Sequence, residues 1–263
     1  VSIETIIFTA KAAKGFVKNA TSFVVVISKF SMKNFFTLVL LCLSIPCLAQ
    51  TADSATYLAD VKKELNVVWP KNRTINLVFH GHSVPAGYWH DHEVHTMESY
   101  PILTLAKVKS QYPYAVVNAI VTAIGGENSM KGQTRFESDV LVHKPDVLFI
   151  DYALNDRFSD INKVREAWEK MIQSAQAKGI KTILVTPSPD QRLDILDAKN
   201  PLEPYVQMIH QLAEKYHTGL ADPYVQFKAI AKRGELKNYM SHVNHPNKIG
   251  HEVIVNELVK WLK

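Results

Sequence analysis

The chain has 263 residues, of which 47% are hydrophobic and 21% are charged, an ordinary globular composition that allows one α/β domain with a sizeable core. Its net charge of +5 would favour a nucleic-acid partner only if the basic residues lay in the folded part. Five lysines and one glutamate lie in residues 1–49, so the remainder carries a net charge of only +1. The charge therefore gives no reason to expect nucleic-acid binding.

The N-terminal region has the pattern of a secretory signal peptide. After Met32 come a positive residue, Lys33, an apolar stretch over 35–45 and then small residues. This apolar stretch is too short for a good membrane span, although a retained N-terminal anchor is the alternative. We expect 32–49 to be a signal peptide, and 1–31 to be an upstream or mis-assigned extension. The mature protein is then exported, either periplasmic or secreted, and meets the membrane only through this segment before cleavage.

Both cysteines, Cys42 and Cys47, belong to the same N-terminal segment. The mature protein is therefore expected to have no disulfide and no thiol chemistry. A large domain can exist in an oxidising compartment without disulfides, because its hydrophobic core is sufficient.

Beyond residue 50, short apolar runs alternate with helical patterns. The apolar runs predict parallel strands at 75–79, 115–121, 147–152, 182–185 and 219–221. The helical patterns lie near 54–64, 100–111, 134–142, 161–178, 204–216, 224–233 and 248–261. Repeated β-α-β units predict an α/β fold: a single three-layer domain with a doubly wound, parallel, five-stranded sheet. We expect an N-terminal helix and linker at 50–74 and the domain at 75–263.

The candidate functional residues follow the predicted strands, where ligands bind in such sheets. Ser83 lies on a tight turn after the first strand, although most serines in such turns only cap helices. Gly126 follows the second strand, where glycine lets backbone N–H groups face a ligand. Asn155 follows the third strand, as either a helix cap or an amide aimed at an oxyanion. His245, held by Pro246 before the last helix, suits a general base.

Taken together, these sites resemble the SGNH or GDSL-like hydrolases over about residues 75–262. Four motifs carry the resemblance: Gly81-His82-Ser83, Gly126-Glu127-Asn128-Ser129 with Gly132 and Arg135, Ala153-Leu154-Asn155-Asp156, and His245-Pro246-Asn247. The resemblance implies the flavodoxin-like SGNH hydrolase fold and a serine esterase with Ser83 as nucleophile and His245 as base. It also implies Gly126 and Asn155 as oxyanion donors. We expect no cofactor and no metal, and a small-molecule or glycan ester as substrate.

Three positions depart from the family pattern. His82 replaces the aspartate beside the nucleophile, and Ala153 replaces a glycine. The family's acid lies three residues before the base, where this chain has His242. We therefore predict a Ser–His dyad, with the base oriented by a backbone carbonyl, the Ser241 hydroxyl or the His242 ring. Asp222 is a more distant carboxylate that could serve.

Two other interpretations start from the same residues. His80, His82, His90, His92 and His95 are close in sequence, and alternate histidines can bind zinc. Loop histidines at a polar site are a sufficient explanation of this cluster. The second alternative is a non-catalytic carbohydrate-binding protein on the same fold. The presence of nucleophile, base and oxyanion amide together argues against it, because binding alone needs none of them.

The residues after Ser83 bear on the substrate. Export and the family resemblance favour deacetylation of an extracellular glycan, hence a short-chain ester with acetyl first, although members of the family also cleave lipid and aryl esters. Tyr88, Trp89, His90 and His92 form either an aromatic and polar wall for a sugar ring or packing beneath the loop. No long apolar lid follows, which disfavours long acyl chains.

Overall fold

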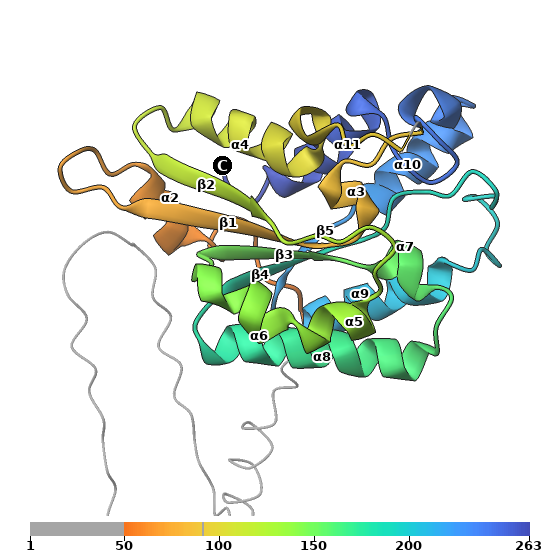
Figure 1. The fold of residues 1–263 in the computed structure, drawn as a ribbon, viewed down its shortest axis with the longest axis horizontal. Helices are drawn as coiled ribbons and strands as arrows, with labels where there is room; N and C mark the ends of the chain where they lie inside the picture. Colours follow the sequence, from red (N-terminus) through yellow and green to blue (C-terminus); the bar gives the residue numbers. More distant parts are fainter. Residues whose placement is uncertain (1–49, 91) are drawn as a thin grey trace, which may run out of the picture. The chain divides into compact units, whose positions relative to one another are not determined.

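Five parallel strands form the central sheet of the domain (Figure 1). The structure is a computed structural model that describes residues 50–90 and 92–263. The strands are β1 (Thr74–Gly81), β2 (Val116–Val121), β3 (Val147–Asp151), β4 (Lys181–Val185) and β5 (Gly219–Ala221). Their order is β2-β1-β3-β4-β5 and every neighbouring pair is parallel. The predicted α/β fold with a doubly wound five-stranded sheet is confirmed.

Helices cover both faces of this sheet. Along the described chain they are α2 (Ala59–Leu65), α3 (Ser83–Ala86), α4 (Tyr100–Gln111), α5 (Ser129–Thr134), α6 (Phe136–Asp139), α7 (Ala153–Asp156), α8 (Ile161–Ala177), α9 (Glu203–Tyr216), α10 (Pro223–Lys232) and α11 (Lys248–Leu258). Three short 3₁₀ helices are η1 (Thr96–Glu98), η2 (Leu141–His143) and η3 (Leu236–Tyr239). Figure 1 shows α4, α10 and α11 on one face, and α5, α6, α8 and α9 on the other.

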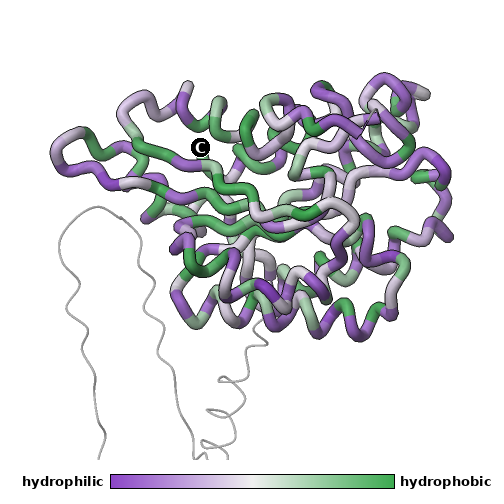
Figure 2. Tube along the Cα trace, in the orientation of Figure 1, coloured by the Kyte–Doolittle hydropathy of each residue, from purple (hydrophilic) through white to green (hydrophobic). Residues whose placement is uncertain are grey.

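Two hydrophobic cores lie on the two faces of the sheet because successive strand residues point to opposite sides. Phe149 belongs to the core beneath α4 and α11, whereas its neighbours Leu148 and Ile150 belong to the core beneath α8 and α9. Both faces of β3 are thus buried, and the central strands are mostly hydrophobic (Figure 2). This is the pattern expected of a parallel sheet covered on both sides.

Helix α2 belongs to the same domain as the sheet. Leu58, Val61 and Leu65 are buried in the core that also contains β1. The predicted helix over 54–64 therefore exists, but its regular part begins only at Ala59. Asp53 explains the later start, because its carboxylate accepts a hydrogen bond from the Ala55 N–H and favours a turn there.

The helix predicted over 134–142 is wrong in outline. The chain forms α5, α6 and η2 in succession instead. Arg135 separates α5 from α6 with φ −105° and ψ 8°, and its side chain turns back beneath the loop after β2. Lys144 ends the region in the left-handed conformation, with φ 48°. Polar contacts of one arginine thus override the helical pattern.

The predicted targeting segment, 1–31 and 32–49, lies outside the described residues. Within the part of the chain that the structure describes, no helix is long and apolar enough to cross a membrane.

Candidate active site

The turn after β1 carries the predicted nucleophile, Ser83. His82 ends the extended segment and caps α3, its Nδ1 accepting a hydrogen bond from the Val84 N–H at 3.2 Å. Ser83 is therefore the first residue of α3, and it is 8% exposed. The turn packs tightly on β3: a Cβ added to Gly81 would lie 2.5 Å from the Asp151 carbonyl oxygen. Position 81, where β1 ends just before Ser83, therefore requires glycine.

His82 makes a second contact from this turn. Its Nε2 lies 3.4 Å from Oδ1 of Asp151, and both side chains are buried. Because Nδ1 accepts from a backbone N–H, the ring proton lies on Nε2 and faces this carboxylate. Tyr100 donates its hydroxyl proton to the other oxygen of Asp151 at 3.1 Å. The histidine that replaces the family's aspartate therefore anchors the nucleophile turn to β3.

The structure brings the predicted base, His245, onto Ser83. Nε2 of His245 lies 2.9 Å from Oγ of Ser83, across 162 positions of sequence. The loop before α11 fixes the ring: the N–H of Ser241 donates to the His245 carbonyl at 2.9 Å, and Asn247 caps α11. Burial, together with the charges of nearby His82 and His242, lowers the pKa of His245 to about 4. A neutral imidazole is therefore available at neutral pH to accept the serine proton.

The other nitrogen of this ring, Nδ1, is buried and makes no hydrogen bond to any described residue. The Ser241 hydroxyl donates to the His245 carbonyl at 3.1 Å, not to the ring. The ring of His242 lies face to face with that of His245, with centroids 6.3 Å apart. Asp222 is held by His210 at 2.8 Å and by Thr186. The expectations that Ser241, His242, a backbone carbonyl or Asp222 hydrogen-bonds the base are therefore wrong for this geometry.

The predicted oxyanion donors are held together by hydrogen bonds. Gly126 follows β2 with φ 75°, a conformation that favours glycine. Asn155 lies on α7, after β3, and its Nδ2 donates to the Glu127 carbonyl at 2.9 Å. A second bond joins the same two segments, because the Ser129 N–H donates to Asp156 at 2.8 Å. Gly126 and Asn155 thus belong to one hydrogen-bonded unit at the carboxyl edge of the sheet, after the two strands that flank β1.

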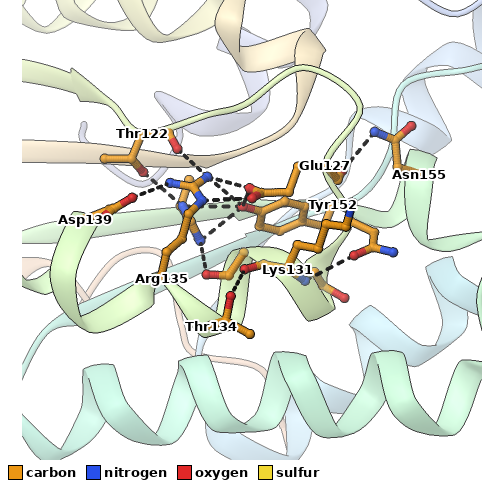
Figure 3. A network of polar contacts seen from close by, with 12 residues as sticks. Thr122, Glu127, Lys131, Thr134, Arg135, Asp139, Tyr152 and Asn155 are labelled. Atoms are coloured by element: carbon orange, nitrogen blue, oxygen red, sulfur yellow. Dashed lines mark hydrogen bonds and ion pairs between the residues drawn. The ribbon is translucent and has the colours of Figure 1, made fainter.

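A buried polar network beneath this unit was not predicted as part of the site. It joins Glu127, Arg135 and Tyr152 (Figure 3), and the Tyr152 hydroxyl also contacts His80. His80 donates from Nε2 to the Gly132 carbonyl at 3.2 Å, and burial together with the Arg135 charge lowers the pKa of His80 to about 4. Glutamate beside the proposed oxyanion glycine, followed eight positions later by arginine, is the sequence signal that could have indicated it.

A second buried ion pair lies on the histidine side of the site. Asp190, in the segment after β4, accepts from Arg157 at 2.5 Å, and the two side chains are 1% and 4% exposed. The backbone N–H of the next residue, Gln191, donates to the Val243 carbonyl at 2.6 Å. The Gln191 side-chain amide donates to the His242 carbonyl at 3.1 Å. The pair therefore links the segment after α7 to the loop that carries the base.

The histidines after Ser83 do not gather around a common centre. His95 lies against Glu93 and Glu98, and the Trp89 ring stacks on it with centroids 4.5 Å apart. Among the described residues, no three histidine, cysteine or acidic side chains are placed to hold a metal ion together. Of the two interpretations of these aromatic residues, a sugar-binding wall or packing, packing therefore fits Trp89, whose ring stacks on His95.

Tyr88 is placed differently from Trp89. Its ring lies over that of His245, with centroids 6.4 Å apart and 26° between the planes. A Cβ added to Gly125 would lie 2.9 Å from the Tyr88 hydroxyl. Tyr88 therefore contacts the loop that carries Gly126 and also flanks His245, so it forms one wall of the site.

The fold and this arrangement agree with the comparison with known families. The model of the GDSL-like lipase/acylhydrolase family matches residues 79–253. The chain belongs to this family. It is a carboxylic ester hydrolase, and the sequence-based expectation of an SGNH/GDSL-like enzyme is confirmed. No curated protein sequence matches the chain.

Several solved structures share the fold. An acetyl xylan esterase, AlAXEase, has 23% identity and a TM-score of 0.61, covering 70% of this chain and 98% of its own. Axe2, an acetylxylan esterase from Geobacillus stearothermophilus, has 17% identity and a TM-score of 0.62, covering 72% and 94%. A two-domain esterase active on acetylated mannans has 20% identity and a TM-score of 0.64, covering 81% of this GDSL-like chain and 55% of its own.

Proposed function

We propose that this protein is an exported esterase that removes short acyl groups, acetyl above all, from carbohydrate. Ser83 is the nucleophile, His245 is the general base, and Gly126 and Asn155 are oxyanion donors. The observation that carries the proposal is the 2.9 Å contact between Oγ of Ser83 and Nε2 of His245. A serine whose hydroxyl meets a neutral imidazole, beside tethered amide donors, has the parts that acyl transfer needs.

The first half of the reaction forms an acyl-enzyme. Oγ of Ser83 attacks the ester carbonyl carbon while its proton passes to Nε2 of His245. The negative oxygen of the tetrahedral intermediate is stabilised by the backbone N–H groups of Ser83 and Gly126 and by the Asn155 amide. When the intermediate collapses, the protonated His245 gives its proton to the leaving alcohol oxygen, which on a glycan is a sugar hydroxyl.

The second half repeats these proton transfers with water. His245 takes a proton from a water molecule, the oxygen attacks the acyl carbon on Ser83, and the same donors hold the second oxyanion. Collapse releases the carboxylic acid and returns the proton to Oγ of Ser83. The base thus alternates between its neutral and protonated forms without a carboxylate on its Nδ1.

Two features support a carbohydrate acetyl ester as substrate. The fold neighbours include esterases named for acetyl xylan and for acetylated mannans. Beside the base, Tyr88 presents an aromatic face, and aromatic rings suit the apolar faces of sugar rings. Export is part of the same proposal, because 32–49 has the pattern of a signal peptide and glycan polymers are found outside the cell.

The decisive test removes the nucleophile. In Ser83→Ala we expect hydrolysis of p-nitrophenyl acetate and release of acetate from acetylated xylan or mannan to be abolished, since no acyl-enzyme can form. A fluorophosphonate probe should label the unmodified protein and fail to label the variant. The matched control is Ser110→Ala on α4, whose hydroxyl only bonds the Lys107 carbonyl and whose loss should leave both readouts unchanged.

The outcomes separate this proposal from a non-catalytic sugar-binding protein on the same fold. Wild-type turnover in Ser83→Ala, or no labelling of the unmodified protein, would contradict the assignment of the nucleophile. Preference for long-chain over acetyl esters would contradict the substrate class while leaving the nucleophile in place.

A further inference from the structure

The loop after β2, which carries Gly126, is held from beneath by a buried ion pair. Glu127 and Arg135 have side chains only 7% and 15% exposed. The guanidinium meets the carboxylate with two parallel bonds, Nε to Oε1 at 2.9 Å and Nη2 to Oε2 at 2.5 Å. Arg135 also donates to the Thr122 carbonyl at 2.6 Å, at the point where the loop leaves β2. One arginine therefore holds both ends of the loop.

Tyr152, which directly follows β3, completes this clamp of Glu127 by Arg135 (Figure 3). Its hydroxyl donates to Oε2 of Glu127 at 2.7 Å, while it accepts from Nε2 of His80 at 3.1 Å. Burial alone would raise the pKa of Glu127. The bonds from Arg135 and Tyr152 nevertheless hold this pKa below its ordinary value. The carboxylate is thus charged and fully engaged.

Glu127 is also the residue through which the two oxyanion donors meet. Its backbone follows Gly126 directly, and its carbonyl accepts the Asn155 amide at 2.9 Å. Gly126 itself has φ 75°, and a Cβ there would meet nothing within 4 Å, so this side of its Cα faces open space. The direction of the Gly126 N–H and that of the Asn155 amide therefore both depend on where the Glu127 backbone lies.

We propose that Glu127 is a positioning residue of the oxyanion hole, whose clamped carboxylate sets the place of both oxyanion donors without itself touching the substrate. This inference rests on the proposed roles of Gly126 and Asn155. Donors fixed before the reaction stabilise the developing oxyanion without having to reorganise. Loosening the clamp is therefore expected to weaken transition-state binding while leaving ester binding unchanged.

The test compares Glu127→Gln with Asp139→Asn. Glutamine keeps the shape but opposes an amide N–H₂ to the guanidinium, so one of the parallel bonds is lost. Asp139 also pairs with Arg135, at 3.4 Å, but is 45% exposed and does not contact the loop. For p-nitrophenyl acetate we expect Glu127→Gln to lower kcat about tenfold with KM nearly unchanged. Asp139→Asn should match the unmodified enzyme.

Inhibition by phenylboronic acid supplies a readout that fold stability alone would not move. Its tetrahedral adduct with Ser83 places an oxygen in the oxyanion hole, so its inhibition constant should rise in Glu127→Gln in proportion to the loss of kcat. Tyr152→Phe is the second variant, used in case Glu127→Gln does not fold. It removes only the hydroxyl that donates to Glu127 and should give a smaller effect of the same kind.

The proposal is overturned if folded Glu127→Gln keeps kcat within about twofold, if only KM changes, or if Asp139→Asn loses as much activity. If Glu127→Gln does not fold, unchanged kcat and unchanged phenylboronic acid inhibition in Tyr152→Phe overturn it. Failure of the proposed function looks different: the unmodified enzyme would then not be labelled by fluorophosphonate, or Ser83→Ala would remain active.

Discussion

The two sides of the reaction centre are built in opposite ways. On the oxyanion side, Glu127 is bonded through its carboxylate and its carbonyl, and Asn155 is tied to it. On the histidine side, His245 has one polar ring contact, with Ser83, and its Nδ1 is buried without a hydrogen bond among the described residues. Polar bonds therefore fix Glu127 and Asn155, whereas packing and backbone bonds fix the ring of His245.

This difference has a chemical consequence for the transition state, in which an oxyanion and an imidazolium form together. The oxyanion meets preorganised N–H dipoles, which is usually the largest contribution of such a site. The imidazolium meets no carboxylate on its ring, and Asp190, the nearby acid that favours its charge, already binds Arg157 and Arg192. With the proposed roles of Gly126, Asn155 and His245, we therefore expect most of the electrostatic stabilisation on the oxyanion side.

Among the changes that compare the two sides, the largest expected effect comes from removing the side-chain donor on the oxyanion side. Asn155→Ala should lower kcat about a hundredfold to a thousandfold with a small change in KM, because the amide acts on the transition state. Steady-state kinetics with p-nitrophenyl acetate measures it. Asn118→Ala, an exposed site on β2 whose amide only meets Asn76, is the matched control. A loss of less than about tenfold in Asn155→Ala would mean that the two sides are more equal than their contacts indicate.

The contrast also explains how far the sequence could lead. The strands follow from apolar runs, and Ser83, His245, Gly126 and Asn155 follow from strand ends together with the resemblance to the SGNH motifs. The structure brings His245 onto Ser83 and ties Asn155 to Glu127, the residue after Gly126. The spacing of Glu127 and Arg135 could indicate an ion pair but not its geometry, because Arg135 has to break a helical pattern to reach the buried carboxylate. The unpaired Nδ1 could not be foreseen either, since sequence indicates which acid is missing but not where the neighbouring side chains turn.

A smaller effect concerns the free energy of unfolding at acidic pH. Each side of the site contains one buried histidine that lowers this free energy when the pH falls. Burial lowers the pKa of His80 to about 4 and that of His251 to about 3. In the unfolded chain both histidines titrate near 6.5, so the unfolded chain binds more protons than the folded chain below that pH. The stability present above about pH 6.5 is therefore lost as the pH falls towards the folded-state pKa values. Each should cost about 2 kcal/mol of unfolding free energy at about pH 5.

Urea unfolding near neutral pH and near pH 5 tests this expectation. In the unmodified protein the Tyr100 N–H donates to Nδ1 of His251 at 3.2 Å. His251→Asn keeps an acceptor for this N–H but cannot take up a proton in this pH range. The variant should therefore show a weaker loss between the two pH values, by about 2 kcal/mol. His143→Asn, at a loop end before β3, is the control and should keep the wild-type pH dependence. An unchanged pH dependence in His251→Asn would show that this histidine does not drive acid unfolding.

The smallest effect, and the most direct probe of the comparison, restores an acid to the histidine side. His242→Asp places a carboxylate three residues before His245, where the family has its acid. A carboxylate beside the ring favours the imidazolium, so the pKa of His245, which burial now holds at about 4, should rise. Activity of the unmodified enzyme should therefore persist to about pH 5 and fall below about pH 4, whereas the variant should lose activity at a higher pH.

The pH profile of kcat/KM separates charge from shape in this experiment. His242→Asn has nearly the same size as His242→Asp but no charge, and should leave the acidic limb of the profile in place. At pH 8 the carboxylate should raise kcat on the order of tenfold or less, because it adds only orientation and charge to a base that already meets Ser83. If the acidic limb moves equally in both variants, loss of the His242 ring explains the shift, and a missing acid does not limit this side. If it moves in neither, Nδ1 is out of reach of position 242, and the loop backbone holds the base in a different way from the family's triad.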